Sequence, residues 1–139
     1  FDCWIANYLI NGSDLLGTQI PSRNLSILYE TFVGNEIISS LIARDDIYYW
    51  KSGNRAEVEY ILKSPNFVGI DVKTNIGENK SLNSFALLEP DASAIIKIGN
   101  IKPFINREYE AFLPNYNGKR KITYINLPHY LSSRILEIF

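Results

Sequence analysis

Two neighbouring stretches decide the fold: RAEVEYIL at residues 55–62 and FVGIDVK at residues 67–73. Both are rich in β-branched and aromatic residues, and a turn at Ser64-Pro65-Asn66 separates them. Side chains alternate along a strand, so in the first stretch Glu57, Glu59 and Ile61 are expected to face one way. The other face is then expected to carry Ala56, Val58, Tyr60 and Leu62. The sequence therefore predicts two adjacent strands, at 56–62 and 67–73.

The predicted elements outside these strands follow from the same kind of pattern. A third strand is predicted at Ile47–Trp50, which makes the first three strands a meander. The other expected elements are a short apolar helix at 1–10, a polar connector at 11–26, a helix at 25–43, a short helix over 83–88 that begins near Ser81, a strand at 94–98, a hairpin through Asn117-Gly118 with a return strand at 122–125, and a terminal helix after Pro128. The order predicts an α/β domain with a mixed sheet flanked by helices.

Composition indicates one globular domain. The chain has 139 residues, is 46% hydrophobic and carries a formal charge of −1. We divide it into a helix and connector at 1–26, a core at 27–98, and a hairpin with a terminal helix at 99–139. Its short apolar runs predict no membrane-spanning helix. The single Cys3 favours a reducing, cytoplasmic location, and the absence of Met before Phe1 indicates a fragment of a longer chain.

The charged residues of the two central strands suggest a site. Glu59 on the first strand and Asp71 and Lys73 on the second are expected to meet when the strands pair. Carboxylates hold Mg²⁺ through oxygen, and a lysine beside them can orient water or stabilise charge in phosphodiester hydrolysis. The same residues could instead be ordinary cross-strand pairs on an exposed hairpin. Spacing alone leaves both interpretations open.

Other residues have weaker indications of function. Residues 97–121 carry six basic and two acidic side chains. Within them Lys119, Arg120 and Lys121 could contact nucleic-acid phosphates or simply form a solvated turn. A net charge of −1 does not support general coating of nucleic acid. The aromatic run at 48–50 is expected to pack in a strand rather than to stack on bases. His129 has no metal-binding partners in the sequence, so we expect a structural role.

Several stretches, in order, resemble one known family. The segment 49–73 resembles its "YWR…GxEVDF…IEVK" pattern, through Tyr49-Trp50, Arg55–Tyr60 and Gly69–Lys73. This pattern is typical of the C-terminal domain of unknown function in a large family of predicted bacterial and archaeal AAA+ ATPases. The other stretches are FDCWI at 1–5 ("YDxGL"), LYETFVGNEI at 28–37 ("LFENFVxxEL"), SLNSF at 81–85 ("SLKSF") and LPHYL at 127–131 ("LPLYL"). The resemblance covers nearly the whole chain.

The resemblance implies a fold and a set of roles. That domain is similar to PD-(D/E)XK nucleases, whose restriction-endonuclease-like core has the order αβββαβ. By position, Glu30 would be the helix carboxylate and Glu59 the acid of the second strand. Asp71 and Lys73 would be the "(D/E)XK" pair, so that Glu30, Glu59 and Asp71 would hold Mg²⁺. The sequence departs from the family pattern at Glu59, where the pattern has Asp.

Three functional hypotheses follow for this domain. In the first, it is a Mg-dependent phosphodiesterase that acts on DNA, in which Glu59, Asp71 and Lys73 are catalytic. In the second, it is a catalytically inactive accessory domain that binds DNA or protein for the ATPase. In the third, it is a purely structural lid. No G-x-x-x-x-G-K-[ST] motif occurs, so we expect the ATP site to lie in another part of the parent chain.

Overall fold

The computed structural model describes residues 22–40, 47–53, 56–63, 66–74, 77–113 and 117–137. Within these ranges the elements are α2 (Ser22–Ser40), β1 (Ile47–Ser52), β2 (Ala56–Leu62), β3 (Val68–Val72), α3 (Lys80–Leu88), β4 (Ala94–Gly99), β5 (Phe104–Phe112), β6 (Lys119–Pro128) and the 3₁₀ helix η2 (His129–Glu137). The predicted strands and the two internal helices are confirmed. The helix predicted at 1–10 and the first part of the connector predicted at 11–26 lie outside the described residues. The prediction of a connector over 22–26 is wrong, because α2 begins at Ser22.

The six strands form one mixed sheet with the order β1-β2-β3-β4-β6-β5. The first three strands make the predicted antiparallel meander. β4 pairs parallel with both β3 and β6, and β5 returns antiparallel on β6 as the predicted hairpin. The parallel strands β3, β4 and β6 thus form the centre of the sheet, and their carboxyl ends lie along one edge.

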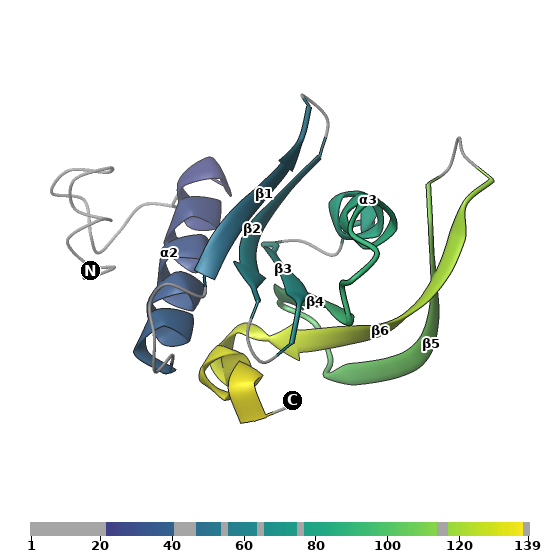
Figure 1. The fold of residues 1–139 in the computed structure, drawn as a ribbon. Helices are drawn as coiled ribbons and strands as arrows, with labels where there is room; N and C mark the ends of the chain where they lie inside the picture. The colour runs from purple at the N-terminus through teal and green to yellow at the C-terminus, as the bar shows by residue number, and fades with distance from the viewer. Residues whose placement is uncertain are drawn as a thin grey trace, which may run out of the picture.

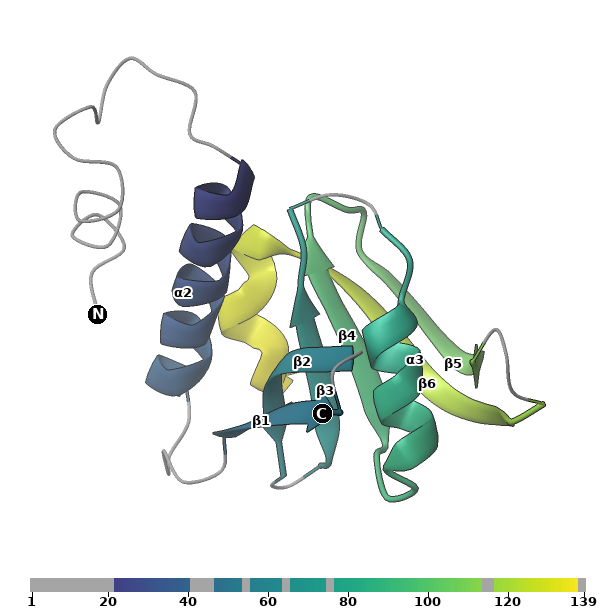
Figure 2. The same cartoon turned by 90° about the horizontal axis from the view of Figure 1, so that it is seen from above.

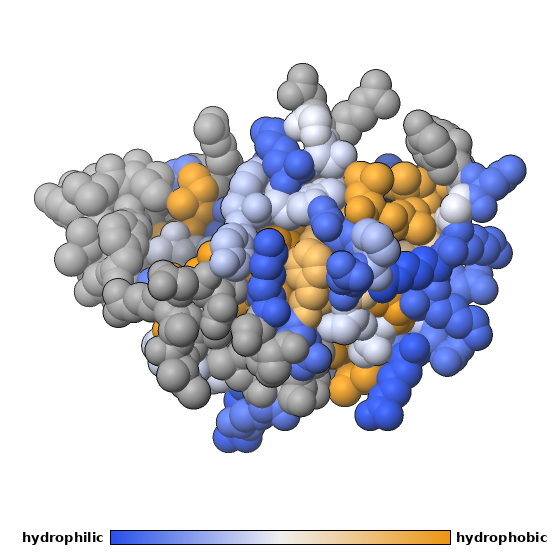
Figure 3. Space-filling model, viewed as in Figure 1, coloured by the Kyte–Doolittle hydropathy of each residue, from blue (hydrophilic) through white to orange (hydrophobic). Residues whose placement is uncertain are grey.

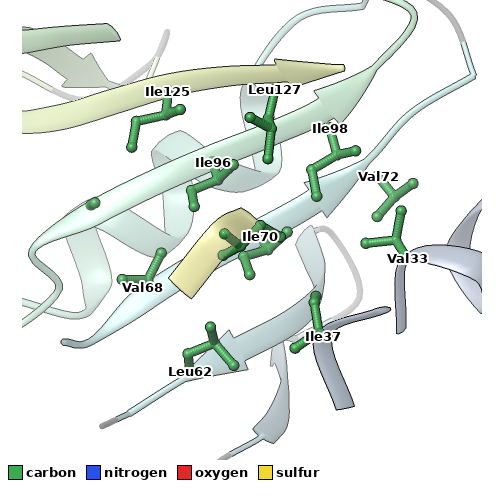
Figure 4. Close-up of a cluster of buried hydrophobic side chains, with 12 residues drawn as sticks. Val33, Ile37, Leu62, Val68, Ile70, Val72, Ile96, Ile98, Ile125 and Leu127 are labelled. Carbon is green, nitrogen blue, oxygen red and sulfur yellow. The ribbon is translucent and has the colours of Figure 1, made fainter. Parts of the chain in front are cut away.

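Helices cover both faces of the sheet (Figures 1 and 2). α2 and η2 pack on one face, where Val33, Ile37 and Ile135 join a cluster of branched side chains from the central strands (Figure 4). α3 packs on the other face through Leu82 and Phe85. Each such side chain, fully buried, contributes about 1.5–3 kcal/mol relative to its exposed state. Burial on both faces explains why β3 and β4 are apolar along nearly their whole length.

Phe85 requires a glycine beneath it. A Cβ atom on Gly69 would lie 2.6 Å from Cδ1 and from Cε1 of the Phe85 ring. The glycine therefore lets α3 sit close to β3, two residues before Asp71. Neither α-helix in the described part of the chain combines the length and apolar character of a membrane span.

The predicted alternation of side chains along β2 is wrong. Val58 and Ile61 both belong to the cluster under α3, whereas Tyr60 and Leu62 pack in the cluster under α2. The cause is a bulge, since Tyr48 pairs with Ile61 while Trp50 pairs with Val58. The two residues between Val58 and Ile61 on β2 thus stand opposite one residue of β1, which interrupts the period of two. Glu59 lies within this bulge.

Candidate functional site

The predicted carboxylates and lysine meet at the carboxyl end of β3. Lys73 Nζ lies 2.6 Å from Asp71 Oδ1 and 3.4 Å from Glu59 Oε1. The Asp71 side chain is 2% exposed, that of Glu59 20% and that of Lys73 36%. We call these three residues the carboxylate–lysine cluster. Two of its members are largely removed from water, which distinguishes it from an ordinary cross-strand pair on an exposed hairpin.

The bulge places Glu59 between β2 and β3. Backbone pairing of these strands ends at Tyr60 and Ile70. Beyond that point the Val72 N–H donates a hydrogen bond to Glu59 Oε2 at 3.2 Å. The carboxylate thus accepts a backbone hydrogen bond where β3 extends past its pairing with β2, and its other oxygen faces Lys73. A break in the strand pairing therefore positions the Glu59 side chain.

A backbone hydrogen bond also fixes the position of Lys73. Its N–H donates a 2.8 Å hydrogen bond to the Ile98 carbonyl, so the chain stays attached to β4 after β3 ends. The pKa of Lys73 is affected most by burial, which lowers it. The Asp71 and Glu59 carboxylates outweigh that effect, and the pKa is raised overall. Lys73 therefore remains a cation within the cluster.

Glu59 titrates far from its ordinary range. Burial raises its pKa to about 8, and a hydrogen bond with Asp71 and the charge of Asp71 act in the same direction, while Lys73 opposes them. Neutral solution therefore leaves a proton on Glu59 when no other cation is present. A carboxylic acid with a pKa near neutrality can accept or release a proton at the pH of the cell.

Glu30 approaches the cluster from α2. Burial raises its pKa, the charge of Glu59 raises it further, and Lys73 lowers it. The helix is held there by Tyr60, whose hydroxyl donates a 2.7 Å hydrogen bond to the Glu30 carbonyl. Gly34 permits this contact, since a Cβ at that position would lie 2.6 Å from the Tyr60 hydroxyl oxygen. α2 thus brings a third carboxylate close enough to couple with Glu59.

Lys97 is a functional candidate that the sequence analysis missed. It lies on β4 directly beside Asp71 in the parallel register. Its side chain is buried, with the residue 4% exposed, and its ammonium donates a hydrogen bond to the Gly77 carbonyl. Burial lowers the pKa of Lys97, Asp71 raises it and Lys73 lowers it. A lysine inside the apolar run AIIKIG was the signal, because a buried ammonium requires partners.

The cluster has oxygen donors that suit a divalent cation, although it does not form a complete set of metal ligands. Within the described ranges, no three His, Cys, Asp or Glu side chains are grouped closely enough to hold a metal ion. The donors that are present are carboxylate oxygens, which Mg²⁺ prefers. Glu59 and Asp71 are held close enough for one proton and the Lys73 ammonium to offset their repulsion. A divalent cation would offset the same repulsion, so the donor set fits such an ion.

The three consecutive basic residues of β6, Lys119, Arg120 and Lys121, occupy two environments. We call them the basic triple. Lys119 pairs with Glu110 at 3.2 Å and Lys121 with Glu108 at 2.5 Å, and all four side chains are at least half exposed. Figure 3 shows hydrophilic residues gathered over this hairpin. The Arg120 guanidinium instead turns toward α3 and donates to the carbonyls of Ala86, Glu89 and Ala92. Phosphate binding by the triple remains a prediction.

The aromatic run and His129 have packing contacts. Trp50 Nε1 donates a 2.8 Å hydrogen bond to Glu89, and its ring packs edge-on against Phe85. Tyr48 and Tyr49 are about half exposed, at 47% and 56%. His129 stacks on Tyr29, with ring centroids 3.9 Å apart, and burial lowers its pKa. Trp50 and His129 thus have the structural roles that we expected.

Comparison with known proteins yields one family and one similar structure. The sequence model of the family described as "Domain of unknown function (DUF4143)" matches residues 26–116. No curated protein matches. A similar solved structure is a chain of a refined half-complex from a tetradecameric assembly of Thermococcus gammatolerans McrB AAA+ hexamers with bound McrC. The TM-score is 0.53 at 16% identity, so the likeness concerns the fold alone.

The extent of these matches defines what is shared. The structural likeness covers 82% of this chain but 33% of the other, so this chain spans about a third of that chain's length. The family match includes Glu30, Lys97 and the whole carboxylate–lysine cluster, and it ends before the basic triple. It covers more than half of the sequence. The chain therefore belongs to the DUF4143 family of domains of unknown function.

Proposed function

We propose that this chain is a PD-(D/E)XK nuclease-like domain that works beside an AAA+ ATPase module. Its carboxylate–lysine cluster would then be a Mg-dependent phosphodiesterase site for DNA. The observation that carries the proposal is the contact of the Lys73 ammonium with both Asp71 and Glu59 at the carboxyl end of a buried central strand. The element order, with α2, three antiparallel strands, α3 and a parallel β4, agrees with the αβββαβ core that the resemblance implies.

The protein groups divide the chemistry among them. Glu59 and Asp71, with Glu30 in support, would hold the cation. Bound Mg²⁺ would supply a Lewis acid that polarises a phosphate and lowers the pKa of water. Lys73 is 36% exposed, so its ammonium can reach a phosphate oxygen and stabilise charge that develops there. Without the cation Glu59 has a pKa of about 8 and carries a proton at neutral pH, so binding of the cation would displace that proton.

The ATPase association has independent support. The fold is similar to that of a chain in an assembly built of McrB AAA+ hexamers and McrC. The length of that chain also leaves room for further domains. By analogy, we propose that the ATPase module belongs to the parent chain of this domain and that nucleotide hydrolysis occurs there.

Isothermal titration with Mn²⁺ tests the site directly. We expect the wild-type protein to bind the ion and Asp71→Asn, which keeps the side-chain shape, to lose most of that affinity. Glu57→Gln is the matched control, because Glu57 lies two residues from Glu59 but is exposed and paired with Lys51. Absence of binding, or equal binding by the wild type and Asp71→Asn, would contradict the metal site. Cleavage of plasmid DNA in Mn²⁺, lost in Asp71→Asn, would establish the reaction.

One observation favours a second candidate, a catalytically inactive domain that binds DNA or protein for the ATPase. Lys73 already lies between the carboxylates, and the part of the chain that the structure describes has no grouping of three acidic or histidine ligands. An ion pair of this kind can simply stabilise the fold. Salt-dependent DNA binding that persists in Asp71→Asn and in Lys73→Met would favour this candidate over the enzyme.

A further inference from the structure

Lys97 lies in an apolar part of the sheet, where burial of a lysine ammonium is energetically unfavourable. Its neighbours along β4 are all buried, and Lys97 itself is 4% exposed. Moving an ammonium from water into such surroundings is unfavourable unless other groups compensate its charge and satisfy its N–H bonds. An apolar residue of similar length would fill the same space without that cost. The position therefore calls for an explanation beyond packing.

The partners of Lys97 belong to the site. In the parallel register it is flanked by Asp71 on β3 and by Asn126 on β6. Its ammonium donates to the carbonyl of Gly77, which belongs to the segment between Lys73 and the start of α3. One buried side chain thus links the strand that carries the cluster to the segment that leaves it.

The two lysines beside Asp71 differ in access. Lys73 is 36% exposed and can meet a substrate, whereas Lys97 is buried and its ammonium bonds to the Gly77 carbonyl. Both lysines nevertheless interact with Asp71, since burial lowers the pKa of each and the charge of Asp71 raises it. Asp71 lies on β3, Lys97 on β4, and Lys73 directly follows β3.

We propose that Lys97 is a positioning residue, which fixes the 77–79 segment against the sheet beside Asp71 and thereby sets the geometry of the carboxylate–lysine cluster. Its effect on cation binding rests on the proposed function, whereas its effect on the 77–79 segment does not. Lys73 meets the substrate in this scheme, and Lys97 acts through Asp71 and through the Gly77 carbonyl.

The experiment uses Lys97→Met, which keeps the length of the side chain but removes the ammonium. We expect amide hydrogen exchange at residues 77–80 to become at least about tenfold faster, because the contact to Gly77 is lost. Mn²⁺ affinity measured by titration should fall about tenfold, as is typical when a residue that supports metal ligands is lost. Lys97→Arg should recover part of both losses, because it restores a charged donor.

The control and the direction of the change distinguish positioning from other roles. Ile95→Ala lowers stability from the same strand and the same face, and it should leave both the local exchange at 77–80 and the Mn²⁺ affinity close to wild type well below the unfolding temperature. A lysine that acted only as a nearby charge would have the opposite effect on affinity, because its removal attracts a divalent cation more strongly.

Several outcomes would overturn the proposal. Exchange at 77–80 that matches the Ile95→Ala control would do so, as would a Mn²⁺ affinity that is unchanged or higher in Lys97→Met. If the wild type binds no Mn²⁺, the proposed function fails, but the exchange data and the recovery in Lys97→Arg still decide the role of Lys97. If Lys97→Met does not fold, Lys97→Gln removes the charge and carries its nitrogen one bond closer to the backbone, which should weaken the contact with the Gly77 carbonyl, and wild-type exchange at 77–80 in that variant would refute the proposal.

Discussion

The carboxylate–lysine cluster and the basic triple both consist of charged residues on strands or directly next to them, but they differ in burial and in how strongly their charges interact. The cluster lies at the end of a central strand, where Asp71 is 2% exposed and the charges change one another's pKa. In the basic triple the two lysines pair with exposed glutamates at the sheet edge, and only Arg120 turns inward. Burial, rather than the number of charges, decides whether neighbouring groups are strongly coupled.

Removal of the cluster lysine should have the largest effect on stability. Lys73→Met leaves Asp71 buried without its 2.6 Å partner. Loss of one member of a fully buried pair costs about 3–5 kcal/mol, and the partial exposure of Lys73 reduces our expectation to about 2–3 kcal/mol. Urea unfolding at pH 7 measures the change. Lys121→Met is the matched control, and an equal loss in both variants would remove the distinction between the two groups.

Substitution of Arg120 should have the next largest effect on stability. Arg120 is the one member of the basic triple whose side chain turns inward and bonds to backbone carbonyls. Arg120→Met removes hydrogen bonds to three carbonyls at and beyond the end of α3. Hydrogen bonds that involve a charged group contribute about 1.5–3 kcal/mol, so we expect a loss of about 2 kcal/mol in urea unfolding. A loss below about 0.5 kcal/mol would indicate that water replaces the guanidinium at these carbonyls.

The pH dependence of stability should carry the signature of Glu59. Its pKa in the folded state is about 8 and its ordinary value is 4.5, so between these values the folded protein binds more protons than the unfolded chain. The free energy of unfolding should therefore decrease as the pH rises from about 4.5 to about 8 and level off above that range. Urea unfolding at several pH values tests this.

Two substitutions separate Glu59 from other titrating groups. Glu59→Gln should flatten the decrease, because an amide does not ionise. Glu57→Gln should leave the decrease in place, because its exposed ion pair with Lys51 lowers the pKa of Glu57 and shifts its titration below the window. An identical slope in the wild type and Glu59→Gln would show that Glu59 is not the responsible group.

The exposed lysines of the basic triple should have the smallest effect. Lys119→Met and Lys121→Met each break one surface ion pair, and such pairs contribute about 0.2–1 kcal/mol at low salt. We expect changes of at most about 0.5 kcal/mol that shrink further at 1 M NaCl, where the Debye length is about 3 Å. A larger loss of stability that persists at 1 M NaCl would show that these exposed lysines are coupled as strongly as the residues of the carboxylate–lysine cluster.

Local patterns in the sequence were sufficient to predict the strands, the internal helices and the meeting of Glu59, Asp71 and Lys73. Apolar runs bounded by turn residues identify the strands, and consecutive antiparallel strands bring neighbouring residues together. The bulge in β2 could not be predicted in this way, because the mismatch between Tyr48–Trp50 and Val58–Ile61 arises from pairing across two strands. It is the bulge, rather than simple alternation, that places Glu59.

The roles of Lys97 and Arg120 could not be predicted from local sequence patterns either. Lys97 was counted among the basic residues of 97–121, although its place in an apolar run marks it as buried. Its partners, Asp71 and Gly77, come from segments that only the parallel pairing of β3 and β4 brings near it. Arg120 lies between two lysines in the sequence, and nothing local distinguishes it. Tertiary contacts decide the roles of both residues.

The parallel centre of the sheet has a consequence for the order of folding. The antiparallel pairs β1–β2 and β5–β6 join segments that are close in sequence, whereas β3–β4 and β4–β6 each close a longer loop. Closing longer loops costs more entropy, so we expect the hairpins to form early and the parallel pairs late. Under this expectation Asp71 and Lys97 meet near the end of folding. A newly made chain would then acquire its charged site only once the whole sheet has closed.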